Sequence, residues 1–586
     1  MSMASVGLSA PAPAACKMAK MAELPVTMMG LKPMIDAKIN DKDVRFEVDS
    51  GAFYSMLSAA SAAELNLKLK AAPYGMKIVG IGGATKPSVA NVDTFTLAGI
   101  PVHNMGFFIT DSVGLGGGSV GLLGQNVFGV SDVEYDFANG KIRFIKSDDC
   151  PHAMLAYWVE DGKAFSFVDI DPISNYHPHI TGTAYLNGAK LRVAFDTGTN
   201  VSLLSLRAAE RAGIDPKSPG VVEAGYVTGI GAGAVRSYIA AFSSFKVGDE
   251  EIHNAKLRFG GVGGLDSDMI IGADFFLSHR VYLAISQHKL YFTYNGGAVF
   301  NLTASATVSP PAESAAEHLP VPNGADNLDA ADLGRRGAAS AARKDYAHAL
   351  ADLTRACELA PDNPEFFFER GVVYLNAQKT DLAMKDFDRT LELKPDNVLA
   401  LLDRAELRVM AKDFQGARTD LDAVDRIAAK QADIRFELAQ GYIQADLPAQ
   451  AVTQFDSWMA SHKHDSMLRF GLARRCWARA LQNDNLDEAL SDCEAAMHGV
   501  YEKSPGYSAV LACRGFVRYR MGRYDKAIAD YNESLKLDPK AALPLYSRGL
   551  AKIRTKQTAE GEAEMAQAVK MEPGVADQFN RLGITP

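Results

Sequence analysis

The chain has 586 residues, of which 47% are apolar and 22% are charged, and its net charge is −9. At roughly 150 residues per domain this length predicts several domains, and the composition excludes global disorder and collagen-like structure. The acidic balance gives no basic surface for nucleic acid, and no apolar run reaches the roughly 18 residues that span a bilayer. We therefore expect a soluble, multidomain protein without a membrane span.

Residues 1–30 are expected to form an N-terminal tail. The tail starts MSMASVGLSAPAPAAC, which is rich in alanine, proline and serine but lacks the basic start and apolar core of an intact signal peptide. Six cysteines are too few for a disulfide scaffold, and none forms a CxxC pair. The four cysteines of the C-terminal half are expected to be small core residues on helices.

Residues 31–298 have the texture of β structure: short alternating apolar runs, many glycines, and turn signals such as Asn139-Gly140 and Asn187-Gly188. Residues 299–328 are rich in proline, alanine and serine without apolar periodicity, which indicates a linker. A different pattern starts at about residue 329.

The β region contains the same landmarks twice. An apolar strand precedes Asp49-Ser50-Gly51-Ala52 in the first copy and Asp196-Thr197-Gly198-Thr199 in the second. A glycine-rich segment follows each turn at nearly the same distance along the chain. An apolar-apolar-glycine segment comes next, at Leu122-Leu123-Gly124 and Ile270-Ile271-Gly272. Matching order and spacing predict two related lobes.

Both copies resemble the lobe of a retropepsin-like aspartic protease, whose signature is this turn, a glycine-rich flap and the apolar-apolar-glycine segment. Because one chain supplies both halves, as in pepsin-like enzymes, the lobes should pair within a monomer. The resemblance implies an all-β, two-lobed fold with lobe 1 at 31–148, a connection at 149–178 and lobe 2 at 179–298.

The resemblance implies that Asp49 and Asp196 are a catalytic pair. Two adjacent carboxyls share one proton, so the charged member takes a proton from a water and the other donates to the scissile carbonyl oxygen. No cofactor or metal is required. The expected supporting residues of the two turns are Ser50, Gly51, Ala52, Thr197, Gly198 and Thr199. The expected flap residues, which close over an extended peptide, are Ile78, Val79, Gly80, Ile81, Gly82, Gly83, Thr228, Gly229, Ile230 and Gly231.

Side chains around the turns carry further expectations. In the family, the hydroxyls matching Ser50 and Thr197 cross-link the turns by hydrogen bonds to the opposite lobe's backbone. A hydroxyl at Thr199 is able to donate to the nearby carboxylate, whereas Ala52 is not, so Asp49 should more often carry the shared proton. Gln125-Asn126 departs from the aspartate usual in that stretch, which puts only lobe packing in doubt.

Two histidine pairs lack accompanying metal ligands. They are His177-Pro178-His179 and His462-Lys463-His464. We interpret both as surface residues.

From residue 329 onward, small residues recur every 34 positions, in the series Gly337, Gly371, Ala405, Ala439 and Ala473. This period is typical of tetratricopeptide repeats, in which two antiparallel helices cross at small residues. We count about seven repeats over 329–586, with residues 575–586 as a capping helix. Stacked repeats bury a continuous core between neighbours and usually bind a protein partner or peptide.

The sequence thus predicts a hydrolase: a single-chain aspartic endopeptidase whose repeats recruit substrate or partner. A rigid-spacer role for the repeats stays open. One alternative is a non-catalytic peptide-binding adaptor that uses protease-like lobes and repeats. A second alternative forms the catalytic pair between two chains.

The family resemblance and the small-residue N-terminus favour export, most readily to a bacterial periplasm, while a cytoplasmic location stays open. In an exported chain we expect a disulfide between Cys16 and Cys150, since they flank lobe 1 and lie outside the repeats.

Overall fold

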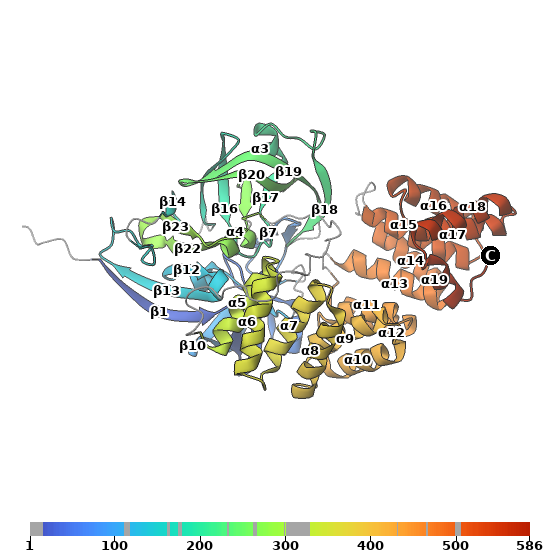
Figure 1. Cartoon of the computed structure of the whole chain (residues 1–586), viewed down its shortest axis with the longest axis horizontal. Helices are drawn as coiled ribbons and strands as arrows, with labels where there is room; N and C mark the ends of the chain where they lie inside the picture. The colour runs from blue at the N-terminus through green and yellow to red at the C-terminus, as the bar shows by residue number, and fades with distance from the viewer. Residues whose placement is uncertain are drawn as a thin grey trace, which may run out of the picture.

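The computed structural model describes residues 16–110, 118–160, 164–173, 179–230, 234–261, 266–297, 299–300, 328–429, 432–463, 467–498 and 505–586. Two β lobes share one interlobe sheet, and a helical array extends from the first lobe (Figure 1). The all-β N-terminal part and the helical C-terminal part agree with the fold class expected from the sequence.

The first lobe is an eight-stranded sheet in the order β2-β3-β4-β11-β5-β10-β9-β6. Strand β11 runs parallel to β4, and β10 runs parallel to β5, so the turn between β4 and β5 lies at the sheet's centre. The strands are β2 (Thr27–Met29), β3 (Lys32–Ile39), β4 (Lys42–Val48), β5 (Met56–Ser58), β6 (Leu69–Ala71), β9 (Ser88–Leu97), β10 (Ile100–Thr110) and β11 (Gly121–Leu123), with helices α1 (Ala59–Glu64) and α2 (Gln125–Phe128) and a separate flap hairpin of β7 (Ile78–Gly80) and β8 (Gly83–Thr85).

The second lobe repeats this plan in a seven-stranded sheet, with the order β15-β16-β21-β17-β20-β19-β18. Here β21 is parallel to β16, and β20 is parallel to β17, as in the first lobe. Its elements are β15 (Thr181–Leu186), β16 (Ala189–Phe195), β17 (Leu203–Ser205), α3 (Leu206–Arg211), β18 (Val222–Thr228), β19 (Ala234–Val247), β20 (Glu250–Gly260), β21 (Met269–Ile271) and α4 (Ala273–Ser278).

A six-stranded sheet joins the lobes, in the order β1-β13-β12-β22-β23-β14. Strands β12 and β22 pair across the lobe boundary, and buried Glu134 of β12 contacts Arg143 of β13 and Arg280 of β22. The elements are β1 (Lys17–Pro25), β12 (Asp132–Asp136), η1 (Phe137–Asn139), β13 (Lys141–Asp148), β14 (Ser166–Asp169), β22 (His279–Ala284), η2 (Ile285–Gln287) and β23 (Lys289–Tyr294).

The expected tail at 1–30 is wrong for its described part, because β1 pairs with β13 and β2 pairs with β3. The connection at 149–178 likewise contributes a strand, since β14 pairs with β23. Backbone hydrogen bonds to a sheet edge order these segments although their sequences carry little apolar periodicity. Residues 1–15 lie outside the described part of the chain.

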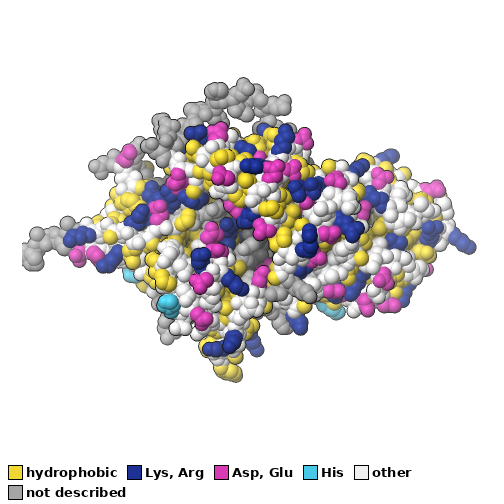
Figure 2. Space-filling model, turned by 90° about the horizontal axis from the view of Figure 1, so that it is seen from below, with side chains coloured by type: hydrophobic (Ala, Val, Ile, Leu, Met, Phe, Trp, Pro, Cys, Tyr) yellow, Lys and Arg dark blue, Asp and Glu magenta, His cyan; other side chains and the backbone are white. Residues whose placement is uncertain are grey.

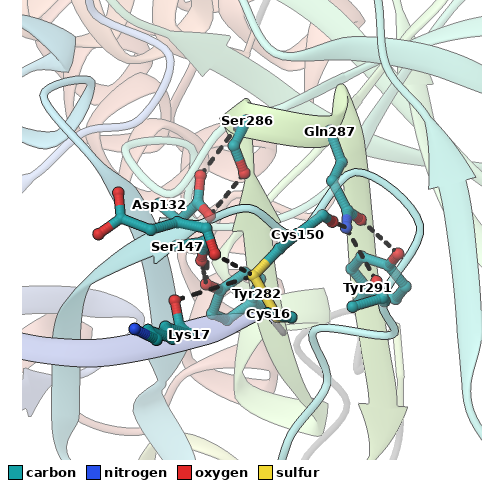
Figure 3. The surroundings of a disulfide bond; sticks show 11 residues. Cys16, Lys17, Asp132, Ser147, Cys150, Tyr282, Ser286, Gln287 and Tyr291 are labelled. Carbon is teal, nitrogen blue, oxygen red and sulfur yellow. Dashed lines mark hydrogen bonds between the residues drawn. A yellow bond between two sulfur atoms is a disulfide. The ribbon is translucent and has the colours of Figure 1, made fainter. Parts of the chain in front are cut away.

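A disulfide joins Cys16, just before β1, to Cys150, just after β13, as expected for an exported chain (Figure 3). Gln287 of the second lobe reaches the same place, where its side-chain amide donates to the carbonyls of Cys150 and Ala153. Near it, the hydroxyls of Ser147 and Tyr282 lie 3.2 Å apart. The bond therefore ties β1 to β13 at one edge of the interlobe sheet, beside Gln287 of the second lobe.

The C-terminal part forms seven consecutive helix pairs, α5 to α18, and a last helix α19, within the described residues. Residues 301–327, most of the expected linker, lie outside the described part. The helices are α5 (Ala330–Ala342), α6 (Tyr346–Leu359), α7 (Pro364–Asn376), α8 (Thr380–Leu393), α9 (Val398–Met410), α10 (Phe414–Ile427), α11 (Arg435–Gln444), α12 (Pro448–Ser461), α13 (Leu468–Gln482), α14 (Leu486–Met497), α15 (Pro505–Arg520), α16 (Tyr524–Leu537), α17 (Ala542–Arg554), α18 (Thr558–Met571) and α19 (Val575–Arg581).

The first repeat packs directly on lobe 1. Helix α5 contacts β2 and η1, Asp332 lies 3.2 Å from Lys141, and Ala338 and Ala339 belong to the core that both lobes share. In Figure 1 the helices α13 to α19 extend furthest from the lobes.

Figure 2 shows acidic and basic side chains intermixed over the face seen from below. No helix among the described residues is long and apolar enough to cross a membrane.

The cysteines of the repeats are buried, as expected for core residues. Two of them are nevertheless bonded, since a disulfide links Cys476 of α13 to Cys493 of α14. The thiol of Cys513 lies 3.1 Å from the Cys476 sulfur.

A buried ion pair closes most repeats. An arginine of the first helix binds an acidic residue of the second, at a nearly constant spacing along the chain. Six of the seven repeats have it within the described residues: Arg336–Asp352, Arg370–Asp386, Arg404–Asp420, Arg475–Asp492, Arg514–Asp530 and Arg548–Glu564. The fourth repeat has Leu438 at this position, and Arg435 binds Asp425 and Gln454 instead. Small residues allow the close crossing: a Cβ on Gly371 would lie 2.7 Å from the Phe387 ring.

We predict that Arg370→Met destabilises the repeat array. Both Arg370–Asp386 hydrogen bonds are 2.8 Å long, and the change leaves buried Asp386 without an ion-pair partner among the described residues. Breaking one side of a buried pair costs about 3–5 kcal/mol. The urea midpoint of the helical circular-dichroism signal should fall. Arg355→Met, which removes an exposed pair with Glu358, is the control and should cost less than about 0.5 kcal/mol. Equal midpoints for both variants would contradict the prediction.

Candidate active site

The two aspartates stand at equivalent ends of their sheets. Asp49 follows β4, and its backbone N–H donates to the carbonyl of Leu123 over 2.9 Å. Asp196 follows β16, and its N–H donates to Ile271 over the same distance. The apolar-apolar-glycine segments found in the sequence therefore fix the start of each turn.

Each turn glycine packs against the opposite aspartate. A Cβ on Gly51 would lie 2.3 Å from Cγ of Asp196, and a Cβ on Gly198 would lie 2.4 Å from Cγ of Asp49. Real Cβ atoms do not approach that closely, so glycine is required at both positions for the carboxyls to meet. The structure thereby brings the two sequence-predicted aspartates face to face.

Hydroxyl groups cross-link the two turns. Ser50 Oγ donates to the Phe195 carbonyl (3.2 Å) and accepts from the Thr197 N–H (3.0 Å). Thr197 Oγ1 donates to the Val48 carbonyl (2.8 Å) and accepts from the Ser50 N–H (3.0 Å). Both side chains are fully buried. These four hydrogen bonds therefore join the two lobes directly at the turns that carry the paired carboxyls.

The two carboxyls have different hydrogen-bond partners. Asp49 accepts from the N–H groups of Gly51 (2.9 Å) and Ala52 (2.7 Å). Asp196 accepts from the Gly198 N–H (2.9 Å) and, through Oδ2, from the Thr199 hydroxyl (2.9 Å). Burial raises the pKa of Asp49 well above its ordinary value, and the neighbouring Asp196 carboxyl raises it further. Both effects favour the protonated form of Asp49.

The flap segments meet above the turns. The N–H of Gly82 donates to the Ile230 carbonyl over 2.9 Å, and a Cβ on Gly80 would lie 2.7 Å from the Ile230 side chain. Gly229 lies against Ile81 in the same way. Ile78, Val79 and Gly83 belong to the β7–β8 hairpin, and Thr228 ends β18. Gly231 lies outside the described residues.

A cavity of about 1220 Å³ lies between the turns and the flaps. Its lining near the dyad is apolar, because Met56 and Leu122 cluster there with Ile78 and Ile230 of the flaps. Side chains of this kind fit apolar groups of a ligand.

Lobe 1 has Asn126 at the position where lobe 2 has the aspartate Asp274, and the contact of this residue with a nearby serine is kept. In lobe 2, Asp274 accepts from the hydroxyl and N–H of Ser202, and Ser202 in turn accepts from Gly272. Asn126 accepts from Ser55 in the same way, and Ser55 accepts from Gly124. The amide oxygen thus replaces the carboxylate in both hydrogen bonds from the serine, while the bond that Asp274 also accepts from the Phe275 N–H has no counterpart at Asn126 among the described residues.

Sequence reasoning missed part of the cavity wall. The expectation of surface histidines is wrong for His179, which lies 3.0 Å from the Gly51 carbonyl, and for buried His462, which lies 2.6 Å from Asp433. His177 and His464 lie outside the described residues. The repeats also line the cavity, through Asp433, Phe436, Glu437, Trp458, His462 and Met467.

We predict that Thr197→Val lowers the melting temperature. Valine keeps the shape of threonine but leaves the buried Ser50 N–H without its acceptor and the Val48 carbonyl without its donor. An unsatisfied buried group costs about 1–3 kcal/mol. Thr183→Val is the control, because no hydrogen bond of that side chain occurs in the described part of lobe 2. Equal melting temperatures of Thr197→Val and wild type would show that the cross-link is not stabilising.

Comparison with known proteins agrees with this geometry. The family model described as aspartyl protease matches residues 35–127 and 182–275. Models of the tetratricopeptide repeat match residues 333–397, 368–432 and 515–555.

Similarity to individual proteins is distant. The Hsp70-Hsp90 organizing protein of Triticum aestivum is 21% identical over 248 residues, which are 42% of this chain and only 36% of that protein. A tetratricopeptide repeat protein from Parabacteroides merdae shares 17% identity over 44% of this chain and 99% of its own, with a TM-score of 0.35. YrrB, a repeat protein with an unusual peptide-binding site, shares 16% identity over 33% of this chain and 97% of its own, with a TM-score of 0.28. By its family matches, the chain joins two regions of the aspartyl protease family to C-terminal tetratricopeptide repeats.

Proposed function

We propose that the chain is an aspartic endopeptidase that hydrolyses peptide bonds with a water activated between Asp49 and Asp196. The observation that carries the proposal is the contact of each aspartate with the other lobe's turn glycine, which leaves the two carboxyls opposed at the floor of one cavity. Two carboxyls so placed share a single proton.

The division of roles follows from the hydrogen bonds. Asp49 holds the shared proton, because burial and the Asp196 carboxyl both raise its pKa. Asp196, which the Thr199 hydroxyl and Gly198 N–H stabilise as a carboxylate, takes a proton from the water. The water oxygen attacks the scissile carbonyl carbon while Asp49 protonates the carbonyl oxygen. No covalent bond forms between enzyme and substrate.

The flaps and the apolar cluster near the dyad favour an extended polypeptide substrate. The flap tips touch through Gly82 and Ile230, so they must separate to admit a chain and then close over it. The apolar cluster of Met56, Leu122, Ile78 and Ile230 favours apolar side chains beside the scissile bond.

The repeats, in this proposal, recruit the substrate or a protein partner, and one chain suffices for catalysis.

An oxidising compartment such as a bacterial periplasm is the proposed location. Two disulfides, Cys16–Cys150 and Cys476–Cys493, support it, because such bonds persist where thiols are not kept reduced.

We predict that Asp49→Asn abolishes peptide cleavage, because asparagine can neither carry nor share the proton. The test is turnover of a peptide library, followed by mass spectrometry, with Asp93→Asn as the control. Asp93 is exposed on β9 and should be dispensable. Equal turnover by Asp49→Asn and wild type would remove the dyad assignment. Peptide binding without turnover by the wild type would favour the non-catalytic adaptor.

The pH profile tests the role of Thr199. Its hydroxyl donates to Asp196 and favours the charged carboxylate, so Thr199→Ala should make that charged form harder to reach. The acid limb of the kcat/KM profile should then move to higher pH, and Thr199→Ser should leave it in place. An unchanged acid limb in Thr199→Ala would show that this hydroxyl does not tune the dyad.

A further inference from the structure

The lobes do not enclose the catalytic cavity alone. One side of it is formed by the fourth repeat and the turn that follows it, through Asp433, Phe436, Glu437, Trp458, His462 and Met467. We call these six residues the repeat wall. They belong to the helical array and follow both lobes in the chain, yet they line the same space as both aspartates.

The repeat wall is attached to lobe 1. Asp433 Oδ2 accepts a hydrogen bond from Ser58 Oγ over 3.2 Å, and Ser58 is the last residue of β5. The other oxygen of Asp433 lies 2.6 Å from Nε2 of buried His462. Arg435 holds the loop before α11, because it donates to the carbonyls of Ala428 and Ala429. The wall therefore has a fixed position beside the cleft.

Of the two carboxylates in the repeat wall, Asp433 has an ion-pair partner and Glu437 has none among the described residues. Lys32 lies 3.3 Å from Glu47, and His462 is bonded to Asp433. Glu437 is exposed to the cavity, and its side chain has no hydrogen bond or ion pair with another residue in the described part of the chain. Desolvation raises the pKa of Glu437 and nearby Asp433 raises it further, whereas the charges of His462 and Lys32 lower it. A cation beside Glu437 would stabilise its charged form.

Aromatic rings line the same cavity as this carboxylate. The rings of Phe436 and Trp458 lie 5.1 Å apart, and the Trp458 ring stacks on His462 at 4.2 Å. Phe436 precedes Glu437 at the start of α11. Trp458 is buried under these contacts, so Phe436 is the more open ring. An aromatic surface combined with a carboxylate attracts the long apolar stem and the charged end of lysine or arginine.

We propose that the repeat wall is a substrate subsite for a lysine or arginine side chain of the polypeptide held at the dyad, with Glu437 as its carboxylate partner. This inference rests on the proposed function, because it takes the cavity to be a substrate cleft. It assigns the fourth repeat a direct part in choosing the peptide. Charge complementarity and continuity with the catalytic cleft identify the occupant.

Binding to the full-length Asp49→Asn chain tests the subsite without cleavage. The probes are fluorescein-labelled dodecapeptides of serine and alanine around a central Leu-Phe, with one lysine moved through the flanking positions. Norleucine replaces lysine in the matched series, so that only the charge and its nitrogen are lost. At one or two adjacent positions lysine should bind about 5- to 10-fold tighter than norleucine, as expected for a partly desolvated ion pair with aromatic contact.

Variants of Glu437 then locate the effect. Glu437→Gln should lower the affinity of the lysine peptide to that of the norleucine peptide and leave the latter unchanged. Glu437→Lys should instead favour a glutamate in the same peptide position. Glu494→Gln is the matched control, since Glu494 is exposed on α14 and does not line the cavity. Retained melting temperatures show that the variants fold.

The two proposals fail differently. Equal affinity for lysine and norleucine at every position, equal losses for both peptides in Glu437→Gln, or no saturable binding of either peptide would overturn the subsite. A wild-type chain that cleaves no peptide while Asp49→Asn keeps a Glu437-dependent lysine preference would overturn the endopeptidase and support the subsite.

Discussion

The distance between the two aspartate turns is fixed by hydrogen bonds and close contacts between the lobes. Ser50 and Thr197 each bind the backbone of the opposite lobe, and Gly51 and Gly198 each leave space that the opposite carboxyl fills. A small separation of the lobes would therefore break buried hydrogen bonds and the carboxyl pair together. The interlobe sheet resists such a separation, because β12 and β22 pair across it and buried Glu134 binds arginines from both lobes.

The inner face of the early repeats is turned towards lobe 1. Arg335, Glu369, Asp403 and Glu437 recur at the repeat period and so occupy one register position in successive repeats. The charge of Arg45 in lobe 1 acts on Glu369, whose pKa burial raises to about 8 despite that cation. Burial also raises the pKa of Asp403 to about 7. Part of the surface that a free repeat array would offer to a partner is thus directed at the protease lobes, and the row ends in the cleft at Glu437.

How far the sequence predicted this molecule depends on the range of the interactions. The period of the repeats and the duplicated Asp-Ser/Thr-Gly turns reflect geometry inside one repeat or one lobe, so they located the repeats and both aspartates. The strand β1 was missed because its order comes from pairing with β13, at the far end of lobe 1 in the chain. The repeat wall was missed because Ser58 and Asp433, which join it to lobe 1, are distant in the chain and leave no periodic trace. The arginine and aspartate that pair within most repeats have a regular spacing, which sequence reasoning could have used.

The order of these elements along the chain has a consequence in time. Asp196 is made 147 residues after Asp49, which at about 5–20 residues per second is a delay of roughly 7–30 s. During that interval lobe 1 has emerged with half of a carboxyl pair, and β12 still lacks its partner β22. Glu437 follows another 241 residues later, a further delay of roughly 12–48 s at the same rates. On the ribosome, the opposed aspartates therefore precede the repeat wall that flanks them, so the nascent chain passes through a stage with an open cleft.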